Sequence, residues 1–272
     1  MESKMTDTTG IVGKMIVSAT PIPEQQLLFP RQTRIEYPPS KPSADSLGEV
    51  EADDNHRYYI KGDCQGSPTR ASEWIGTLLA DYIGITAPPA VVIQRLNGEL
   101  VFGSRRVAGV ADDLITQNYL TNSANLEPNS SCLTGVLSSI YAFDLFINNV
   151  DRHFGDYLTV QDIGARRLFA FDYGRALFFR WPWNDFPAPG DQTRTCGKVL
   201  RSTLGFDVQA AHAILDKLAR VAPSVIDGFL NQMPREWLTQ PLKREFIRVW
   251  SEEGRHARIN ALRKGLDDGS LL

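Results

Sequence analysis

The hydrophobic pattern of this 272-residue chain changes after Gly109, and this change is the strongest constraint on its fold. Before Gly109, short apolar runs that favour strands flank one amphipathic helix pattern. After it, apolar residues recur at helical spacing over long segments. We therefore expect an α+β protein with a small, strand-rich N-terminal lobe and a mainly helical C-terminal lobe.

The pattern also suggests domain boundaries. Residues 1–40 are rich in Pro, Thr, Gln and Ser, and only residues 11–17 in this stretch have strand character. We expect an N-terminal extension here, partly ordered at best. Residues 41–110 would then form the N-terminal lobe, and residues 111–272 the helical C-terminal lobe.

The expected N-terminal lobe consists of a hairpin, a helix and a second hairpin. Asn97-Gly98 lies between two apolar runs and is typical of a two-residue hairpin turn. Residues 70–83 have apolar side chains at helical spacing, and Gly84 follows where a helix would end. The expected strands are residues 47–50, 57–60, 90–94 and 100–107.

The expected C-terminal lobe begins with a long, largely buried helix at residues 133–147, which ends in a polar cluster at residues 148–153. Two short strands are predicted next, at residues 157–160 and 168–171. The remaining predicted helices cover residues 208–220, 223–231, 234–250 and 252–264.

Composition excludes several classes of protein. Hydrophobic residues make up 42% and charged residues 22%, so the chain can build a core. The net charge is −3 with no long basic run, which argues against a nucleic-acid partner. No segment is apolar enough to span a membrane or to serve as a secretory signal, so we expect a cytoplasmic protein. Cys64, Cys132 and Cys196 are too few and too widely spaced for a disulfide framework or a zinc site, and we expect free thiols.

Charged residues at the ends of expected elements could form a site. Lys61 ends a strand, and Glu73 lies twelve residues on, in the next helix, where it could pair with this lysine. Asp151, Asp156 and Asp172 lie in two loops beside apolar segments. Carboxylates so close together favour a divalent cation between them, and oxygen ligands suit Mg²⁺. Each residue alone is also compatible with a solvated surface position.

Four motifs in one order carry a family resemblance. Lys61 is followed by Glu73 in Arg-Ala-Ser-Glu-Trp, then by Phe-Asp-Leu-Phe-Ile-Asn-Asn-Val-Asp-Arg-His at residues 143–153, and then by Phe-Asp-Tyr-Gly at residues 171–174. This set resembles the HipA-like kinase family, which shares an Asp-Arg-His loop with the phosphatidylinositol 3- and 4-kinases. The resemblance covers residues 45–180 and implies a two-lobed, protein-kinase-like fold.

The resemblance also implies which residues would bind ATP and metal. Lys61 would contact the α- and β-phosphates, and Glu73 would orient it. Asp151 would be the catalytic aspartate that accepts the proton of an attacking hydroxyl or aligns that hydroxyl. Asp172 would hold Mg²⁺, or Mn²⁺ as an alternative, and Asp156 would be a second metal ligand. The remaining ATP contacts are expected from Ser46 and from Arg106, Val107 and Ala108 between the lobes.

Three further motif residues are expected to support the site. Arg152 and His153 belong to the motif, but we expect a structural role for them before contact with substrate. Asp144 lies in an otherwise apolar helix and would be costly to bury without a partner, so Arg152 would pair with it or with another buried carboxylate.

The chain departs from the family pattern in two places. Asp156 stands where such families usually carry Asn, which adds a negative charge beside Asp151 and Asp172. The expected phosphate loop, residues 43–48, contains a single glycine, and Asp45 in it would stand near phosphate. Backbone N–H groups could still cradle phosphate there.

These observations leave three functions open. The first is an ATP- and Mg²⁺-dependent kinase that phosphorylates a protein Ser/Thr or a small hydroxyl substrate. The second, motivated by the two departures, is a pseudokinase that binds nucleotide or a partner without transferring phosphate. The third is a lipid or small-molecule kinase, although the chain lacks a polybasic patch for anionic headgroups.

Residues 181–190 are a candidate substrate or partner loop. They contain Trp181 and Trp183 with three prolines and follow the Asp172 segment, where kinases place an activation segment. The alternative is that both tryptophans pack against the helical lobe.

Overall fold

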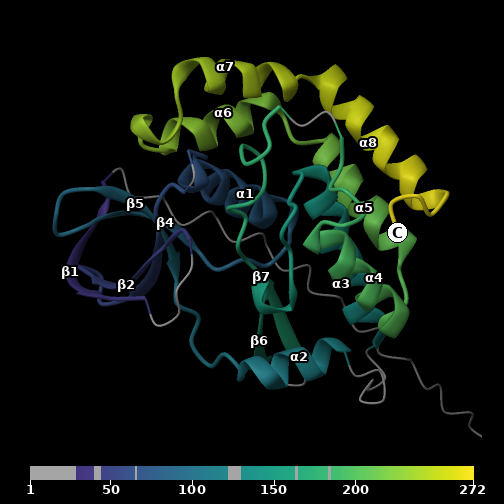
Figure 1. Cartoon of the computed structure of the whole chain (residues 1–272), viewed down its shortest axis with the longest axis horizontal. Coiled ribbons are helices and arrows are strands. Elements are labelled where there is room, and N and C mark those ends of the chain that lie inside the picture. Colours follow the sequence, from purple (N-terminus) through teal and green to yellow (C-terminus); the bar gives the residue numbers. More distant parts are fainter. Residues whose placement is uncertain (1–28, 40–43, 65, 122–129, 163–164, 183–184) are drawn as a thin grey trace, which may run out of the picture.

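The computed structural model describes residues 29–39, 44–64, 66–121, 130–162, 165–182 and 185–272. A β-barrel at the N-terminal end is followed by a mostly helical part (Figure 1). The expected α+β organisation in two lobes is therefore confirmed. Within the described residues, no helix is both long and apolar enough to cross a membrane.

The N-terminal lobe is a closed five-stranded barrel with the order β1-β2-β3-β5-β4. The antiparallel partners alternate inward and outward side chains, and the inward set includes Val50, Tyr58 and Ile93, each at most 2% exposed. The strands are β1 (Arg31–Tyr37), β2 (Ser46–Ala52), β3 (Arg57–Lys61), β4 (Ala90–Gln94) and β5 (Leu100–Arg105).

Strand β1 corrects the expectation of an extension up to residue 40. It pairs antiparallel with β2 and parallel with β4, and so closes the barrel. Its sequence is Arg-Gln-Thr-Arg-Ile-Glu-Tyr, in which Thr33 alone is buried, so it lacks the apolar alternation that identifies a strand. Residues 11–17, which had strand character, lie outside the described residues.

Helix α1 (Thr69–Ile83) lies between the barrel and the C-terminal helices (Figure 1). Eleven of its fifteen residues are buried. The helix is therefore covered on more than the single face that an amphipathic surface helix buries. It ends, as expected, at Gly84, whose φ of 88° is in the left-handed region that glycine adopts without strain.

The C-terminal lobe is built around α3 (Ser130–Phe146), which packs against α4, α5 and α8. Phe143, Leu145 and Phe146 at its C-terminal end are at most 1% exposed. The other elements are α2 (Asp113–Thr121), η2 (Phe154–Asp156), β6 (Tyr157–Asp162), β7 (Ala165–Ala170), α4 (Gln192–Leu204), α5 (Val208–Ala219), α6 (Pro223–Gln232), η3 (Arg235–Trp237), α7 (Gln240–Val249) and α8 (Glu252–Asp267).

Three differences from the expected helices have local causes. The helix expected at residues 234–250 is divided into η3 and α7, because Pro241 occupies the first turn of α7 and could not lie in a helix interior. Helices α2 and α4 were not expected. Helix α2 is short and buries only Thr116 and Leu120, and α4 is mostly polar, with Cys196 and Leu200 as its buried apolar residues.

The two lobes are connected by side chains that reach across to main-chain carbonyls. Trp237 Nε1 in η3 donates to the carbonyl of Leu100 in β5 at 3.0 Å, and Arg70 in α1 donates to the same carbonyl at 2.7 Å. Trp74 in α1 donates to the carbonyl of Phe229 in α6 at 3.0 Å. The position of α1 is thereby fixed from both sides.

Gly76 tests how tightly α1 is packed. A Cβ atom at this position would lie 2.6 Å from Cβ of Tyr173, so there is no room for alanine. Gly76→Ala should lower the free energy of unfolding by about 1–3 kcal/mol through overpacking. Gly228→Ala is the matched control, since this glycine of α6 has no atom within 4 Å of the added Cβ. The control should be neutral or stabilising by up to about 1 kcal/mol because alanine favours the helix. Urea unfolding measures both; equal stabilisation by the two changes would contradict the packing of α1 on Tyr173.

Candidate active site

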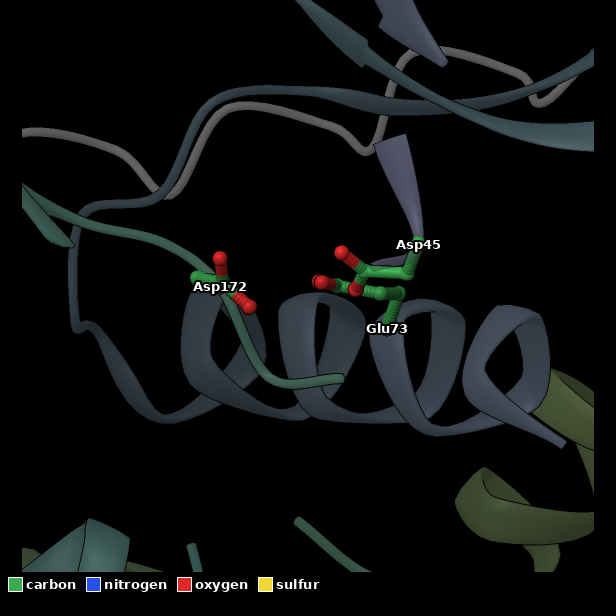
Figure 2. Close-up of side chains that lie close together, drawn as sticks. All are labelled: Asp45, Glu73 and Asp172. Atoms are coloured by element: carbon green, nitrogen blue, oxygen red, sulfur yellow. The ribbon is translucent and has the colours of Figure 1, made fainter. Parts of the chain in front are cut away.

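Lys61 forms the centre of a cluster of charged side chains beside α1. Its Nζ lies 2.6 Å from Oε1 of Glu73, 2.8 Å from Oδ1 of Asp172 and 3.6 Å from Oδ2 of Asp45. Figure 2 shows the three carboxylates facing one another, from the residue before β2, from α1 and from the loop after β7. The structure therefore brings together Lys61, Glu73 and Asp172, and adds Asp45.

Local backbone geometry places each of these side chains. Lys61 ends β3, where it is paired with Ser46 of β2 and Phe102 of β5. Glu73 lies early in α1, and its Oε2 accepts a hydrogen bond of 3.0 Å from the backbone N–H of Tyr173. Asp172 has a φ of 63°, a left-handed conformation that turns the chain sharply after β7. Glu73 and Asp172 thus come from distant parts of the chain, and the hydrogen bond to Tyr173 holds the Glu73 carboxylate against the loop that carries Asp172.

Burial and the Lys61 ammonium determine the charges in this cluster. Burial raises the pKa of Glu73 to about 7, although Lys61 opposes this shift. For Asp172, burial would also raise the pKa, but the ammonium of Lys61 lowers it to about 2. Burial disfavours the charged form of Lys61, and the carboxylates of Asp172, Glu73 and Asp45 more than offset this and raise its pKa well above the usual value. Lys61 and Asp172 are therefore an ion pair at neutral pH.

A second, fully buried ion pair lies under the loop that follows α3. Arg152 Nε donates to Oδ2 of Asp144 at 2.8 Å and Nη2 donates to Oδ1 at 2.9 Å, a bidentate arrangement. Asn149 Nδ2 donates to the same carboxylate at 2.9 Å. The expected pairing of Arg152 with Asp144 is confirmed, and these hydrogen bonds offset the cost of burying both charges.

Arg152 also links the two loops of the site. Its Nη1 donates to the carbonyl of Phe171, the residue before Asp172. Its backbone N–H donates to Thr193 Oγ1 at 2.9 Å, and the Thr193 hydroxyl donates to the carbonyl of Asn149 at 2.6 Å. The loop that carries Asp151 is therefore attached to the loop that carries Asp172.

Asp151 is exposed at the surface of this loop, between the buried residues Val150 and Arg152. Its backbone N–H donates to Oδ1 of Asn149 at 3.3 Å. The backbone is thus held in place while the carboxylate faces solvent, where it can meet a hydroxyl group from outside.

His153 and Asp156 form a reciprocal cap on the short helix η2. The backbone N–H of His153 donates to Oδ2 of Asp156 at 2.8 Å, and the N–H of Gly155 donates to Nδ1 of His153 at 3.0 Å. The Asp156 side chain is 5% exposed. Burial raises the pKa of Asp156 to about 8, against the opposing charge of Arg152 and with a further increase from Asp172. A protonated Asp156 is neutral, like the Asn that the family usually carries.

The remaining expected ATP contacts lie at the ends of β2 and β5. Ser46 begins β2, and its Oγ accepts from the N–H of Gly48 at 3.4 Å. Gly48 has a φ of 108°, and a Cβ atom there would lie 2.1 Å from the carbonyl oxygen of Tyr37. Arg106 N–H donates to the carbonyl of Arg57 at 2.8 Å. Val107 is half-buried and Ala108 is exposed in the connection from β5 to α2.

Two contributions were not expected from the sequence. Thr193 in α4 connects to Arg152 from 41 residues away, and no motif marks it. Asn149 lies within the motif at residues 143–153, but its contact with Asp144 was not expected. Both act through main-chain and carboxylate hydrogen bonds, which a sequence pattern does not reveal.

The candidate substrate loop is only partly described. Trp181 is half-buried, with its ring centroid 5.7 Å from those of Phe178 and Phe246. Trp181 therefore packs against the helical lobe, which was the alternative to a role in a substrate loop. Trp183 lies outside the described residues.

The oxygen donors around Lys61 are of the kind that suits a hard divalent cation, and the Lys61 ammonium is the cation that they contact in this structure. Carboxylate oxygens of Asp45, Glu73 and Asp172 lie within 4.8 Å of one another. Oxygen ligands of this kind suit Mg²⁺, which is commonly held by one or two carboxylates together with substrate phosphates. Asp156 is close enough for its charge to interact with that of Asp172.

A comparison with models of protein families decides the family. The model described as HipA-like kinase matches residues 49–249, which is most of the chain. This chain belongs to the HipA-like kinase family. A HipA-like kinase is a phosphotransferase, and the family implies ATP and a divalent metal. A comparison with curated proteins found no match.

Three solved structures are similar to this chain. The proinflammatory kinase CtkA of Helicobacter pylori is similar over 86% of this HipA-like kinase and 99% of its own chain, with 17% identity and a TM-score of 0.53. HipA of Shewanella oneidensis, in complex with HipB and operator DNA, matches 77% of this chain and 60% of its own, with 12% identity and a TM-score of 0.46. WaaP in complex with acyl carrier protein matches 85% of this chain and 89% of its own, with 15% identity and a TM-score of 0.38. The likeness to CtkA confirms the expected kinase-like fold.

The raised pKa of Asp156 predicts that replacing this residue increases stability by an amount that depends on pH. Between its ordinary pKa of 3.8 and its folded value of about 8, the native state binds more protons than the unfolded state. Stability therefore falls as pH rises through this window. Asp156→Asn stays neutral, so it should be more stable than the parent by about 1 kcal/mol or more at pH 8.5, and the difference should shrink toward pH 5. Thermal melting across this range measures it, with exposed Asp227→Asn in α6 as the control. A difference that is constant with pH would contradict the assignment.

Proposed function

We propose that this HipA-like kinase binds ATP and Mg²⁺ between its lobes and transfers the γ-phosphate to a Ser or Thr hydroxyl of a protein. The observation that carries the proposal is the contact of Lys61 Nζ with Glu73 at 2.6 Å and with Asp172 at 2.8 Å. This arrangement joins a strand lysine, a helix glutamate and a loop aspartate, as phosphoryl transfer in kinases requires. The nucleotide-binding lobe would end near residue 110, and residues 111–272 would carry the catalytic loop.

In the proposed reaction, Lys61 binds the α- and β-phosphates and Glu73 keeps its ammonium in place. Asp172 and Asp156 are the residues that would hold Mg²⁺, which when bound would neutralise charge on the phosphates. Ser46 and the backbone of Arg106, Val107 and Ala108 would provide further nucleotide contacts.

Asp151 would align the attacking hydroxyl and accept its proton. The hydroxyl oxygen forms a bond to the γ-phosphorus, the bond from this phosphorus to the β–γ bridging oxygen breaks, and ADP leaves. Asp144, Arg152 and His153 support this step from behind the loop, because Arg152 fixes the loop to the carbonyl of Phe171 and His153 caps η2. Catalysis then depends on positioning and on charge stabilisation.

The exposure of Asp151 and its neighbours favours a protein substrate. Asp151, His153 and Gly155 are all exposed. A hydroxyl on the surface of another protein can therefore reach Asp151 without entering a closed cavity. Free cysteines, two of them buried, fit the reducing cytoplasm, where ATP is available.

Transfer of labelled γ-phosphate tests the proposal directly. The parent protein should label itself or a generic protein substrate with Mg²⁺ or Mn²⁺, and EDTA should abolish the label. Asp151→Asn and Asp172→Asn should each lower the rate by about 100-fold or more, since each removes a group used in the transition state. Asp227→Asn should retain the parent rate. Acid hydrolysis of the labelled protein should release phosphoserine or phosphothreonine.

Two results would contradict the proposal. Binding of ATP with Mg²⁺ but no transfer to any acceptor would indicate a pseudokinase. Transfer to a lipid or a small hydroxyl compound, with no label on protein, would retain the kinase and exclude the protein substrate.

A further inference from the structure

Asp45 stands where the proposed function needs room for phosphate. Its Oδ2 lies 3.6 Å from Nζ of Lys61, the group proposed to bind the nucleotide phosphates. Its side chain is 11% exposed. The same oxygen would lie 3.1 Å from a Cβ atom placed on Gly174, in the loop that carries Asp172. The Asp45 carboxylate, from the residue before β2, therefore lies beside that of Glu73 (Figure 2) and close to the loop that carries Asp172.

The β-sheet holds Asp45 in this position. Its carbonyl accepts a hydrogen bond of 3.0 Å from the N–H of Gly62, the residue after Lys61. The next residue, Ser46, is paired directly with Lys61. Main-chain pairing thus holds Asp45, directly before β2, beside Lys61 at the end of β3.

The charges around Lys61 oppose a bare polyphosphate. One ammonium is shared by the carboxylates of Asp45, Glu73 and Asp172. Like charges a few ångströms apart repel strongly where solvent is partly excluded. A nucleotide phosphate that binds Lys61 must therefore either displace the Asp45 carboxylate or arrive with cations that neutralise it. Glu73 and Asp172 belong to the proposed machinery, which leaves Asp45 as the additional charge.

We propose that Asp45 is a specificity-determining residue that competes with nucleotide phosphate for Lys61 and thereby excludes nucleotide that carries no divalent cation. The inference rests on the proposed function, because it assumes that Lys61 binds phosphate. It adds that the chain's own Asp45 carboxylate, directly before β2, contacts the ammonium that phosphate would bind.

Nucleotide affinity with and without metal tests this proposal. The dissociation constants of ATP and ADP are measured by calorimetry in EDTA and in excess Mg²⁺. Asp45→Asn should bind ATP about tenfold or more tightly than the parent in EDTA, because one repulsive charge is removed. Its affinity for ATP with Mg²⁺ should change less, so the increase in ATP affinity that Mg²⁺ provides should be smaller than in the parent. Added KCl should reduce the difference, as screening requires.

Matched variants separate charge from folding. Asp45→Ser, which is also neutral, should behave like Asp45→Asn, and Asp45→Glu should keep the metal dependence of the parent. Glu51→Gln makes the same change of charge in β2, the strand that follows Asp45, and the Glu51 carboxylate faces Arg57 at 3.9 Å instead of Lys61. This control should leave the affinity in EDTA unchanged. Melting temperatures show that each variant is folded.

The outcomes distinguish this inference from the proposed function. If the neutral Asp45 variants bind ATP in EDTA no better than the parent, the inference is wrong, whatever the kinase activity. If they lose affinity for ATP with Mg²⁺, Asp45 is a metal ligand and the inference is also wrong. If the parent binds no ATP even with Mg²⁺, the proposed function itself fails.

Discussion

The docking of α1 onto the segment after Asp172 is the interaction on which the geometry of the site depends. Ser72 donates to the carbonyl of Ala176 at 3.0 Å and accepts from the N–H of Phe178 at 3.3 Å. The next residue, Glu73, accepts from the N–H of Tyr173. Two consecutive side chains of one helix thus satisfy main-chain groups of a segment 100 residues away. The distance between Glu73 and Asp172, and with it the place of Lys61 between them, follows from this contact.

Arg152 makes a comparable connection inside the C-terminal lobe. A guanidinium this deeply buried is tolerated only when its donors are satisfied, and here Asp144 takes two of them while the carbonyl of Phe171 takes another. The same group lies 4.9 Å from the ring centroid of Tyr173, over its face. Arg152 and α1 therefore approach Tyr173 from different elements, and the Asp172 loop is fixed on both sides.

Local patterns explain what could be predicted from the sequence. The hairpin follows from the Asn97-Gly98 turn, and the helix that carries Glu73 follows from periodicity. The cost of burying a lone carboxylate indicated that Asp144 needs a partner, and Arg152 was one candidate. Strand β1 could not be foreseen, because its pairing partners supply the reason for it and its own residues are mostly polar. Thr193 and the contact of Asp45 with Lys61 depend on which strands and helices become neighbours. The tertiary arrangement creates these contacts, and no feature of the residues alone indicates them.

The energetics indicate which part of the site can move. Withdrawing Glu73 from Lys61 by moving α1 would expose Trp74, Ile75 and Leu79, each at most 3% exposed, at a cost of about 2 kcal/mol for each side chain. It would also break the hydrogen bonds of Ser72. Turning the Asp45 carboxylate away from Lys61 breaks their ion pair of 3.6 Å and leaves the hydrogen bond from the Gly62 N–H to the Asp45 carbonyl in place. The charge balance around Lys61 can therefore change at the Asp45 side chain without displacing α1.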